Sequence, residues 1–340
     1  MKDKKLTEKD TCLLIATYNR AEDIEKTFDS LIKNKNIPGK VVIIDQSKNE
    51  ETKLVVNKYK KRLPIDYIYC NIPSADISMN MGIKKYRDKF PILITSGDDV
   101  DFLENYLDEV IKEFNNNPKI MAIGGKDISS GNSYNFDSPG NKIKNLILRI
   151  FFLPFKENHK FRITGPYGHT SSPIINENIE VQWIPGVNTC WRSEIYKNYL
   201  WPEIKGYNVI DDIDSSYHVY KEYGKGSLMM IPKCRVYHRY SHAGRYDDKK
   251  RIFVNHEDHF SYFYMYFNNP LGKIKLFLSL AGIIIGNFLR FIFRPKKETF
   301  NGLVYNVQAI RYCLKNRKDI ENKKYRLYLN EDLSMKKDIL

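Results

Sequence analysis

CLLIATYNR, at residues 12–20, is the stretch of sequence that first reveals how this chain folds. It begins with five apolar residues and ends with four that are mostly polar, which is typical of a buried strand that stops at a surface. VVIID at residues 41–45 is a second run of the same kind. Between them, the apolar residues of 23–33 recur at helical spacing, so the segment predicts a strand–helix–strand unit.

The alternation of strand and helix patterns continues to residue 124. Apolar runs at residues 65–69, 91–95 and 120–124 predict further strands, and residues 52–61 and 103–114 predict helices. Such alternation is typical of right-handed crossovers and of a mainly parallel sheet covered on both faces. We therefore predict an α/β fold in which ligands bind beyond the carboxyl ends of the strands.

The positive charge of the chain is concentrated in its last third. The 340 residues include 55 Lys+Arg and 41 Asp+Glu, a formal net charge of +14. Residues 1–230 hold 33 basic and 31 acidic side chains, whereas residues 231–340 hold 22 basic and 10 acidic ones. A hydrophobic content of 42% excludes a disordered or collagen-like chain. The basic region indicates a polyanionic partner, either nucleic acid or an anionic membrane surface.

The cysteines and the N-terminus favour a reducing compartment. The five cysteines are too widely spaced for a zinc cluster or a disulfide framework: Cys12, Cys70, Cys190, Cys234 and Cys313. The first ten residues, MKDKKLTEKD, are hydrophilic and lack the apolar run of a secretory signal. We therefore expect a cytoplasmic location.

Four polar clusters follow predicted strands or open a predicted helix. They are TYNR at residues 17–20, DQS at 45–47, SGDDV at 96–100 and DDID at 211–214. A lone Asp after a strand, such as Asp45, serves equally well as a turn or helix-capping residue. Neighbouring carboxylates at a sheet edge, however, suit Mg²⁺ or Mn²⁺, and such a cation suggests a phosphate-bearing substrate. No GxGxxG follows the first strand, which disfavours a dinucleotide-binding domain.

The order of ATYNR, VVIIDQS, TSGDDV and GYNVIDDIDSSY resembles the inverting glycosyltransferases of family 2, of the bacterial surface-polysaccharide type. The resemblance covers residues 11–250 and implies the GT-A fold, the nucleotide-diphospho-sugar transferase fold with a mainly parallel central sheet. ISMNMG at residues 77–82 falls where the family has an Asn-x-Gly helix start, and residues 183–196 resemble its acceptor-side segment. We expect a catalytic domain at residues 1–255 and a basic, aromatic and apolar helical extension at residues 256–340.

The resemblance also implies roles for individual residues. Those expected to bind the nucleotide sugar are Thr17, Tyr18, Arg20, Asp45, Asp98 and Arg245. Within this set Asp45 matches the carboxylate that binds the nucleobase, and Asp98 the one that faces the ribose. Asp99 and His238 match ligands of a divalent cation, Mg²⁺ or Mn²⁺, and Asp212 matches the general base.

The sequence departs from the family pattern at two positions. Gly97 replaces the first acid of the usual Asp-x-Asp, and Met79 stands where many members carry a basic residue near the diphosphate. More of the phosphate charge must then be neutralised by the metal or by other basic groups, for which Arg239 is a candidate beside Arg245. His242 is a rival to His238 as metal ligand, because it follows four residues later.

The implied reaction moves a sugar from a UDP-, GDP- or dTDP-linked donor to a hydroxyl of a saccharide or lipid-linked acceptor. Asp212 would take the hydroxyl proton, and a single displacement would invert the anomeric centre. A sugar-phosphate nucleotidyltransferase is an alternative, but it needs a Gly-rich basic loop after the first strand. A nucleic-acid-binding protein is another, but no recognisable module is present, so we do not expect nucleic acid as a partner.

The apolar segment at residues 276–293, LFLSLAGIIIGNFLRFIF, has three interpretations. It is a core helix, an interfacial helix held by flanking Lys and Arg residues, or a membrane span that Asn287 and Arg290 disfavour. Residues 142–156 have the same basic and apolar character. Because the charge and the apolar stretches coincide, we expect peripheral association with an anionic membrane at its cytoplasmic face.

Overall fold

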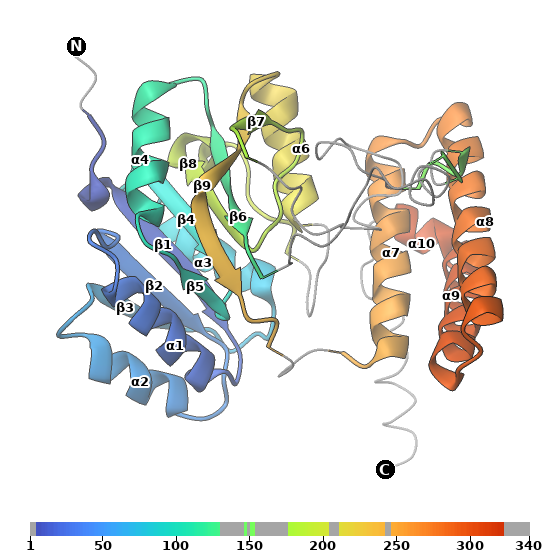
Figure 1. The fold of residues 1–340 in the computed structure, drawn as a ribbon, viewed down its shortest axis with the longest axis horizontal. Coiled ribbons are helices and arrows are strands. Elements are labelled where there is room, and N and C mark those ends of the chain that lie inside the picture. The colour runs from blue at the N-terminus through green and yellow to red at the C-terminus, as the bar shows by residue number, and fades with distance from the viewer. Residues whose placement is uncertain are drawn as a thin grey trace.

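The computed structural model describes residues 5–129, 146–147, 150–153, 176–203, 211–241 and 246–322. Figure 1 shows two parts, a sheet covered by helices and a group of helices beside it, α7 to α10. The helical group follows the last strand of the sheet in the chain.

The described residues form one mixed sheet and two sets of helices. The strands are β1 (Thr11–Thr17), β2 (Lys40–Asp45), β3 (Ile65–Tyr69), β4 (Ile92–Ser96), β5 (Val100–Phe102), β6 (Ala122–Asp127), β7 (Ile179–Glu180), β8 (Asn188–Arg192) and β9 (Leu228–His238). The helices around the sheet are α1 (Ala21–Ile32), α2 (Glu51–Tyr59), α3 (Ala75–Tyr86), α4 (Tyr106–Asn116) and α6 (Asp211–Tyr223). Two short 3₁₀ helices, Glu8–Asp10 and Ser193–Lys197, complete this part.

The sheet has nine strands in the order β3-β2-β1-β4-β8-β6-β9-β5, with β7 paired to β9. The four strands β3, β2, β1 and β4 are parallel to one another, and β6 and β9 point the same way. Only β5, β7 and β8 among the described strands run in the opposite direction. The predicted α/β fold with a mainly parallel sheet is therefore confirmed.

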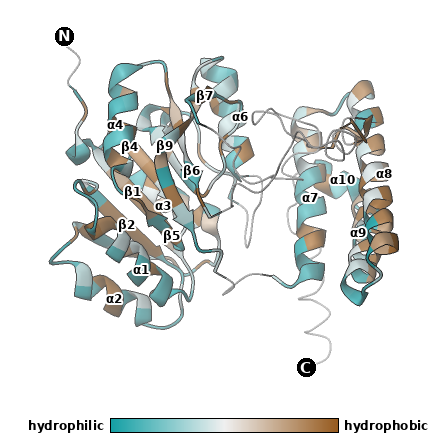
Figure 2. Ribbon diagram, viewed as in Figure 1, coloured by the Kyte–Doolittle hydropathy of each residue, from teal (hydrophilic) through white to brown (hydrophobic). Residues whose placement is uncertain are grey.

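The core lies on both faces of the sheet, because alternate residues of a strand point to opposite faces. Leu13 and Ile15 of β1 pack with residues of α1, α2 and α4, whereas Cys12 and Leu14 pack with residues of α3 and α6. This arrangement explains why the strands β1 and β2 are apolar throughout. Figure 2 shows the hydrophobic strands enclosed by helices with hydrophilic outer surfaces.

Several elements depart from the sequence-based expectation. α3 begins at Ala75, so Asn80 and Gly82 lie inside this helix and not at its start. Asn80 exchanges two hydrogen bonds with the backbone of Trp201, 2.8 and 3.0 Å long. The strands β8 and β9 were not predicted.

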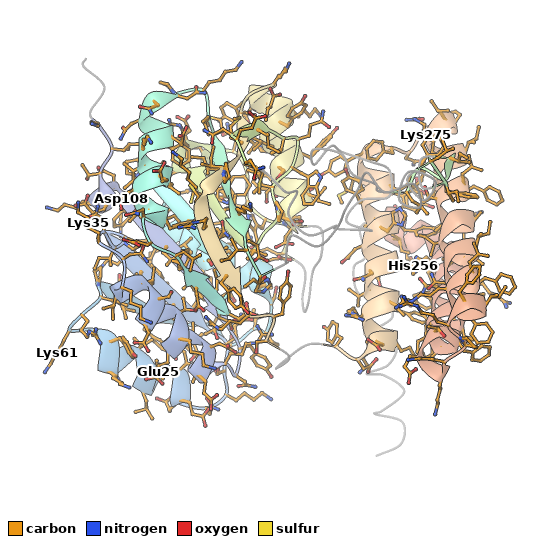
Figure 3. All side chains as sticks on the ribbon, in the orientation of Figure 1. Glu25, Lys35, Lys61, Asp108, His256 and Lys275 are labelled. Atoms are coloured by element: carbon orange, nitrogen blue, oxygen red, sulfur yellow. The ribbon has the colours of Figure 1, made fainter. Side chains whose placement is uncertain are left out.

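The helical group consists of α7 (Asp248–Tyr266), α8 (Pro270–Phe293), α9 (Lys297–Lys315) and α10 (Arg317–Glu321). Its core joins Phe260 and Phe263 of α7 to side chains of the other three helices. His256, labelled in Figure 3, lies between α7 and α9, where its Nε2 is 2.9 Å from Asn306 Oδ1. The domain boundary expected after residue 255 remains a prediction, and α7 runs continuously through that position.

All five cysteines lie in the described part of the chain, and each is buried without a disulfide. Among the described residues, α8 is the one helix long and apolar enough to cross a membrane. Of its most apolar 18-residue window, 28% is buried. Length and composition alone are equally compatible with a core helix, so they do not decide between the interpretations of this segment.

Candidate functional site

The polar clusters after β1, β2 and β4 meet at one edge of the sheet. Thr17 is the register partner of Asp45, so β1 and β2 end side by side. β4 ends at Ser96, next to Ile15 of β1, and the turn Gly97-Asp98-Asp99 follows. The parallel strands therefore deliver the predicted acidic residues to the edge where ligands bind in such sheets.

Asp98 is held by the last residue of β1 and by a residue of the loop that follows it. Thr17 Oγ1 donates a 2.8 Å hydrogen bond to one carboxylate oxygen, and Arg20 Nη1 lies 2.8 Å from the other. Burial raises the pKa of Asp98 to about 6, and the neighbouring Asp99 carboxylate adds to this effect, although Arg20 and Thr17 oppose it. Both Asp98 oxygens thus already have donors from these two residues.

Asp99 is bound instead by the end of β9. His238 Nε2 lies 3.1 Å from Asp99 Oδ1, and the backbone N–H of Ser241 donates a 2.9 Å hydrogen bond to Oδ2. Burial by itself would raise the pKa of Asp99, but His238 and the Ser241 N–H outweigh it and lower the pKa to about 2. The Asp99 carboxylate is therefore ionised at neutral pH, beside an imidazole.

The Asp99–His238 pair has the chemistry of a partial divalent-cation site. Carboxylate oxygen and imidazole nitrogen are both ligands that Mn²⁺ accepts, and Mg²⁺ sites commonly use one or two carboxylates with substrate phosphates. In the part of the chain that the structure describes, no group of three His, Cys, Asp or Glu side chains could hold a metal. The pair consequently fits a cation whose remaining ligands come from a bound diphosphate and water.

The guanidinium of Arg239, a candidate for contact with the diphosphate, is bound within the protein. It forms ion pairs with Asp23 and Asp101. It also donates to Thr27 Oγ1 at 3.0 Å and to the carbonyl oxygens of Asp23 at 2.8 Å and Asp98 at 3.1 Å. Arg239 thus ties α1 and β5 to the turn that carries Asp98.

Asp45 is fully buried at the end of β2. Its Oδ1 accepts a 2.9 Å hydrogen bond from the backbone N–H of Ser47, and its Oδ2 accepts a 2.8 Å bond from the hydroxyl of Tyr67. Ser47 Oγ in turn accepts from the backbone N–H of Asn19 at 2.8 Å, which joins the loops after β1 and β2. Tyr18 lies half-buried in the same loop as Asn19.

Asp212 lies in the first turn of α6, where two backbone N–H groups bind its carboxylate. Gly186 donates to Oδ2 at 3.1 Å and Ile213 to Oδ1 at 2.8 Å. The residue after Gly186, Val187, accepts a 3.2 Å hydrogen bond from the N–H of Gly97. Two consecutive residues therefore link Asp212 to the turn that carries Asp98 and Asp99.

The neighbouring carboxyls of Asp211 and Asp212 have raised pKa values. Desolvation is the largest cause for both, and the charge of Asp212 further raises the pKa of Asp211. The N–H groups of Gly186 and Ile213 oppose the rise at Asp212. A carboxyl with a raised pKa is better suited to accept a proton than an ordinary Asp side chain.

Asp214, the third acid of DDID, has a structural role. It is buried, and it accepts hydrogen bonds from the hydroxyls of Tyr199, at 2.8 Å, and Tyr266 of α7. Tyr266 also packs against Tyr217 with ring centres 3.9 Å apart. The helical group is thus joined directly to the helix that begins with Asp211 and Asp212.

The structure brings together five of the nine predicted site residues: Thr17, Arg20, Asp98, Asp99 and His238. Asp45 and Tyr18 lie beside them, and Asp212 is linked to them through the backbone. Arg245, the rival ligand His242 and most of residues 142–156 lie outside the described residues. Met79 is buried in the core with α3, so it does not replace a basic residue at the site edge.

Three contributions to the site were not anticipated from the sequence. They are the hydroxyl of Tyr67 on Asp45, the N–H of Ser241 on Asp99 and the N–H of Gly186 on Asp212. Two are backbone groups, which any residue type supplies, so the sequence carries no signal for them. Tyr67 lies in the predicted strand at residues 65–69, and a polar tip near a strand end was its only sign.

Comparison with known proteins gives a family match for part of the chain, and a fold. Residues 12–174 match the sequence model of the family described as glycosyl transferase family 2. A comparison with curated protein sequences returns no match. The family match covers the ends of β1, β2 and β4 but not Asp212 or His238.

Two solved structures are similar to the whole chain at low sequence identity. One is the mannosyltransferase PcManGT from Pyrobaculum calidifontis in complex with GDP-Man and Mn²⁺, with 14% identity and a TM-score of 0.53. That alignment covers 91% of this chain and 87% of the other. The other is TarS 1–349 from S. aureus in complex with UDP-GlcNAc, with 12% identity, a TM-score of 0.53 and coverage of 88% and 81%. Both similarities confirm the predicted GT-A fold.

Proposed function

This chain is a glycosyltransferase with a family 2 domain at residues 12–174, and we propose that it transfers a sugar from a nucleotide-diphosphate donor to an acceptor hydroxyl. The observation that carries the proposal is the convergence of Asp99 and His238, 3.1 Å apart, at the edge where Thr17, Arg20 and Asp98 meet. Binding of a nucleoside diphosphate needs such a combination of hydrogen-bonding and cation-binding groups.

The residues at this edge bind and orient the donor. Asp45, held by Tyr67 and Ser47, presents its carboxylate as an acceptor to the imino N–H of a uracil, thymine or guanine base. Asp98 faces the ribose, and Thr17, Tyr18 and Arg20 line the nucleotide. Arg245 contacts the diphosphate. The nucleotide complexes named for the two similar structures, GDP-Man and UDP-GlcNAc, support a nucleotide-sugar donor without selecting the base.

Asp99 and His238 would hold a divalent cation, Mg²⁺ or Mn²⁺. When bound, the cation stabilises the negative charge that develops on the departing nucleoside diphosphate. The chemistry of the two ligands supports this assignment, as does the Mn²⁺ named in the complex of the mannosyltransferase.

Asp212 acts as the general base. Its carboxylate takes the proton of the acceptor hydroxyl while that oxygen bonds to the anomeric carbon, and the bond from this carbon to the diphosphate oxygen breaks. The leaving diphosphate keeps the electron pair of the broken bond. Because attack and departure occur on opposite faces of the sugar, the anomeric configuration is inverted.

The acceptor is a saccharide or lipid-linked saccharide in the biosynthesis of a polysaccharide. The chain works peripherally at the cytoplasmic face of an anionic membrane, where such an acceptor is presented. The basic character of residues 231–340 supports this location, because this region has 22 basic and only 10 acidic side chains.

A donor panel tests the proposal. UDP-, GDP- and dTDP-sugars are incubated with the full chain and Mg²⁺, Mn²⁺ or a chelator, and the release of nucleoside diphosphate is measured. We expect one nucleotide series to react, the chelator to stop it, and Asp212→Asn to slow it by about 10²–10⁴-fold. NMR of the product gives the anomeric configuration. No metal-dependent release from any donor, or an unchanged rate in Asp212→Asn, would refute the assignment.

A further inference from the structure

We propose that α8 lies in the plane of an anionic membrane surface, with one side packed on the protein and the opposite side among the lipids. This inference rests on the peripheral location proposed above and adds the surface that makes the contact and its orientation. Among the three interpretations of residues 276–293, it selects the interfacial helix.

One side of α8 is a row of apolar side chains, all exposed except the half-buried Ala281. The row recurs at intervals of three and four residues: Ile274, Phe277, Ala281, Ile285, Phe288 and Ile292. Its large members are all exposed, with Phe277 72% accessible, and Leu271, Leu289 and Phe293 (78% accessible) lie beside the row. Figure 2 shows this hydrophobic helix at the side of the molecule away from the sheet. Such a row on one side of a helix is typical of a surface that is covered in use.

The opposite side of α8 is buried within the helical group. Leu276 and Leu280 belong to the core shared with α7, α9 and α10, and Ser279 and Ile283 are buried beside them. At Gly282 a Cβ atom would lie 2.5 Å from Phe151 Cβ, so the segment containing Phe151 crosses α8 in close contact. Crossing a bilayer would require either detaching this side or carrying the polar α9 into the hydrocarbon, and both are costly.

The crossing segment extends the apolar surface. Leu146, Ile147 and Ile150 are exposed, and Phe151 and Leu153 next to them pack on α8. Lys275, labelled in Figure 3 near one end of α8, lies 5.3 Å from the centre of the Phe152 ring. Two stretches that are far apart in the sequence therefore contribute to one surface.

The charges around α8 identify the occupant as an anionic surface. Six basic side chains lie near the two ends of the helix, three within it and three just after it: Lys273, Lys275, Arg290, Arg294, Lys296 and Lys297. Within the described residues none of the six forms an ion pair with a carboxylate. From residue 270 to residue 322 the chain has ten basic and three acidic side chains. An apolar row edged by cations matches the acyl and phosphate layers of an anionic bilayer, whereas a second copy would bring like charges together.

Vesicle sedimentation of the full chain tests the surface. Vesicles of phosphatidylcholine with phosphatidylglycerol are compared with vesicles of phosphatidylcholine alone. We expect binding to the anionic vesicles, weakened at least about tenfold by Phe277→Ser/Phe288→Ser and also weakened by Lys296→Glu/Lys297→Glu. Leu54→Ser is the matched control, because Leu54 is 66% exposed on α2, and it should bind as the wild type does. Equal binding of all variants would overturn the proposal.

The orientation is tested with a cleavable tag after residue 340. Protease added outside the vesicles should remove the tag from bound protein if α8 lies in the plane, and a protected tag would show a span and refute the inference. A change of oligomeric state in Phe277→Ser/Phe288→Ser without loss of vesicle binding would instead assign the row to a second copy. Release of nucleoside diphosphate from donor should be unchanged in this variant, so failed vesicle binding and a failed transferase assignment give different results.

Discussion

At the scale of single residues, the two carboxyl pairs of the candidate site differ in how their surroundings shift the pKa values. Asp98 and Asp99 have pKa values driven apart, because Asp98 is mainly desolvated and Asp99 is bound by His238 and a backbone N–H. Asp211 and Asp212 both have raised pKa values, because burial desolvates both carboxyls and no cation contributes an opposing effect. The first pair suits cation binding, and the second suits proton transfer.

We expect the buried pair Asp211 and Asp212 to lower the stability of the fold by an amount that depends on pH. Since the pKa of Asp211 is raised on folding to about 8, the cost is absent below the ordinary pKa of about 4, grows as pH rises from there to the raised value, and is fully present above it. We expect Asp211→Asn to raise the melting temperature at about pH 8 and to change it little at about pH 4. Asp88→Asn is the control, because its side chain is 75% exposed at the end of α3. An Asp211→Asn melting temperature that rises equally at both values would contradict the explanation.

We expect Arg239 to affect the cation site indirectly, through the turn of Asp98 and Asp99 that it helps to hold. Lysine retains the charge but cannot reach Asp23, Asp101 and the carbonyl oxygen of Asp98 together, because it lacks the planar fork of arginine. We expect Arg239→Lys to lower the free energy of unfolding by about 1–3 kcal/mol and to raise the Mn²⁺ concentration needed for half-maximal activity.

The control for Arg239 is Arg251→Lys, since Arg251 pairs with Asp248 on the exposed start of α7. Activity is titrated with Mn²⁺ at a temperature where both variants are folded. If Arg239→Lys is destabilised while its Mn²⁺ titration matches that of the wild type, Arg239 stabilises the fold without positioning the turn.

At the scale of elements, α7 fixes the start of α6. Tyr266 donates to Asp214 and packs on Tyr217, and Tyr262 forms a small core with Ile213. These contacts surround the turn that carries Asp212. The position of the proposed base therefore depends on a helix that follows the sheet in the chain.

We expect Tyr266→Phe to lower kcat while leaving the KM for the donor unchanged, because it frees the start of α6 without touching the Asp98–Asp99 turn. The lost hydrogen bond to a buried carboxylate should cost about 1–3 kcal/mol of stability. Tyr264→Phe provides the comparison, because Tyr264 lies on the same helix and packs on Phe263. Steady-state kinetics with the donor of the panel measure the effect, and a raised donor KM with normal kcat would place Tyr266 in another role.

The elements that the sequence predicted are those whose pattern comes from burial. β1, β2, β3 and β4 are covered by helices, so each appears as an apolar run. The start of α3 was misplaced because the helix buries Asp76, Ser78 and Asn80 as well as apolar residues, which removes the helical contrast. β8 has the sequence NTCWR and is a strand because it pairs with β4 and β6. Its local sequence pattern therefore does not predict a strand.

The same distinction applies to the site. The acidic residues were predictable because they follow strands whose ends must meet at one edge. Their partners were not, because Ser241, Gly186 and Tyr67 reach the site through pairings distant in the sequence. Arg239 was assigned to the diphosphate because of its residue type. Its contact with the carbonyl oxygen of Asp98 depends on where β9 ends, which the sequence pattern does not show.

At the scale of the whole molecule, the sheet and the helical group form a single working unit. A chain that ends at residue 255 would lose Tyr262 and Tyr266, which pack on α6, and would cut α7 in its middle. It would also lose the exposed row of α8. Removal of the helical group therefore changes both the base helix and the membrane surface, which point variants can separate.

We expect the chain truncated after residue 255 to lose donor turnover as well as vesicle binding, whereas Phe277→Ser/Phe288→Ser loses vesicle binding alone. The reason is that Ile213, next to Asp212, is buried against Tyr262, so truncation exposes apolar surface beside the base and frees the first turn of α6. Thermal unfolding of both proteins, with turnover of the donor measured in the absence of vesicles, provides the comparison. A truncated chain with full turnover would show that residues 1–255 are an independent catalytic domain, and that the contacts of Tyr262 and Tyr266 serve only to attach the helical group to it.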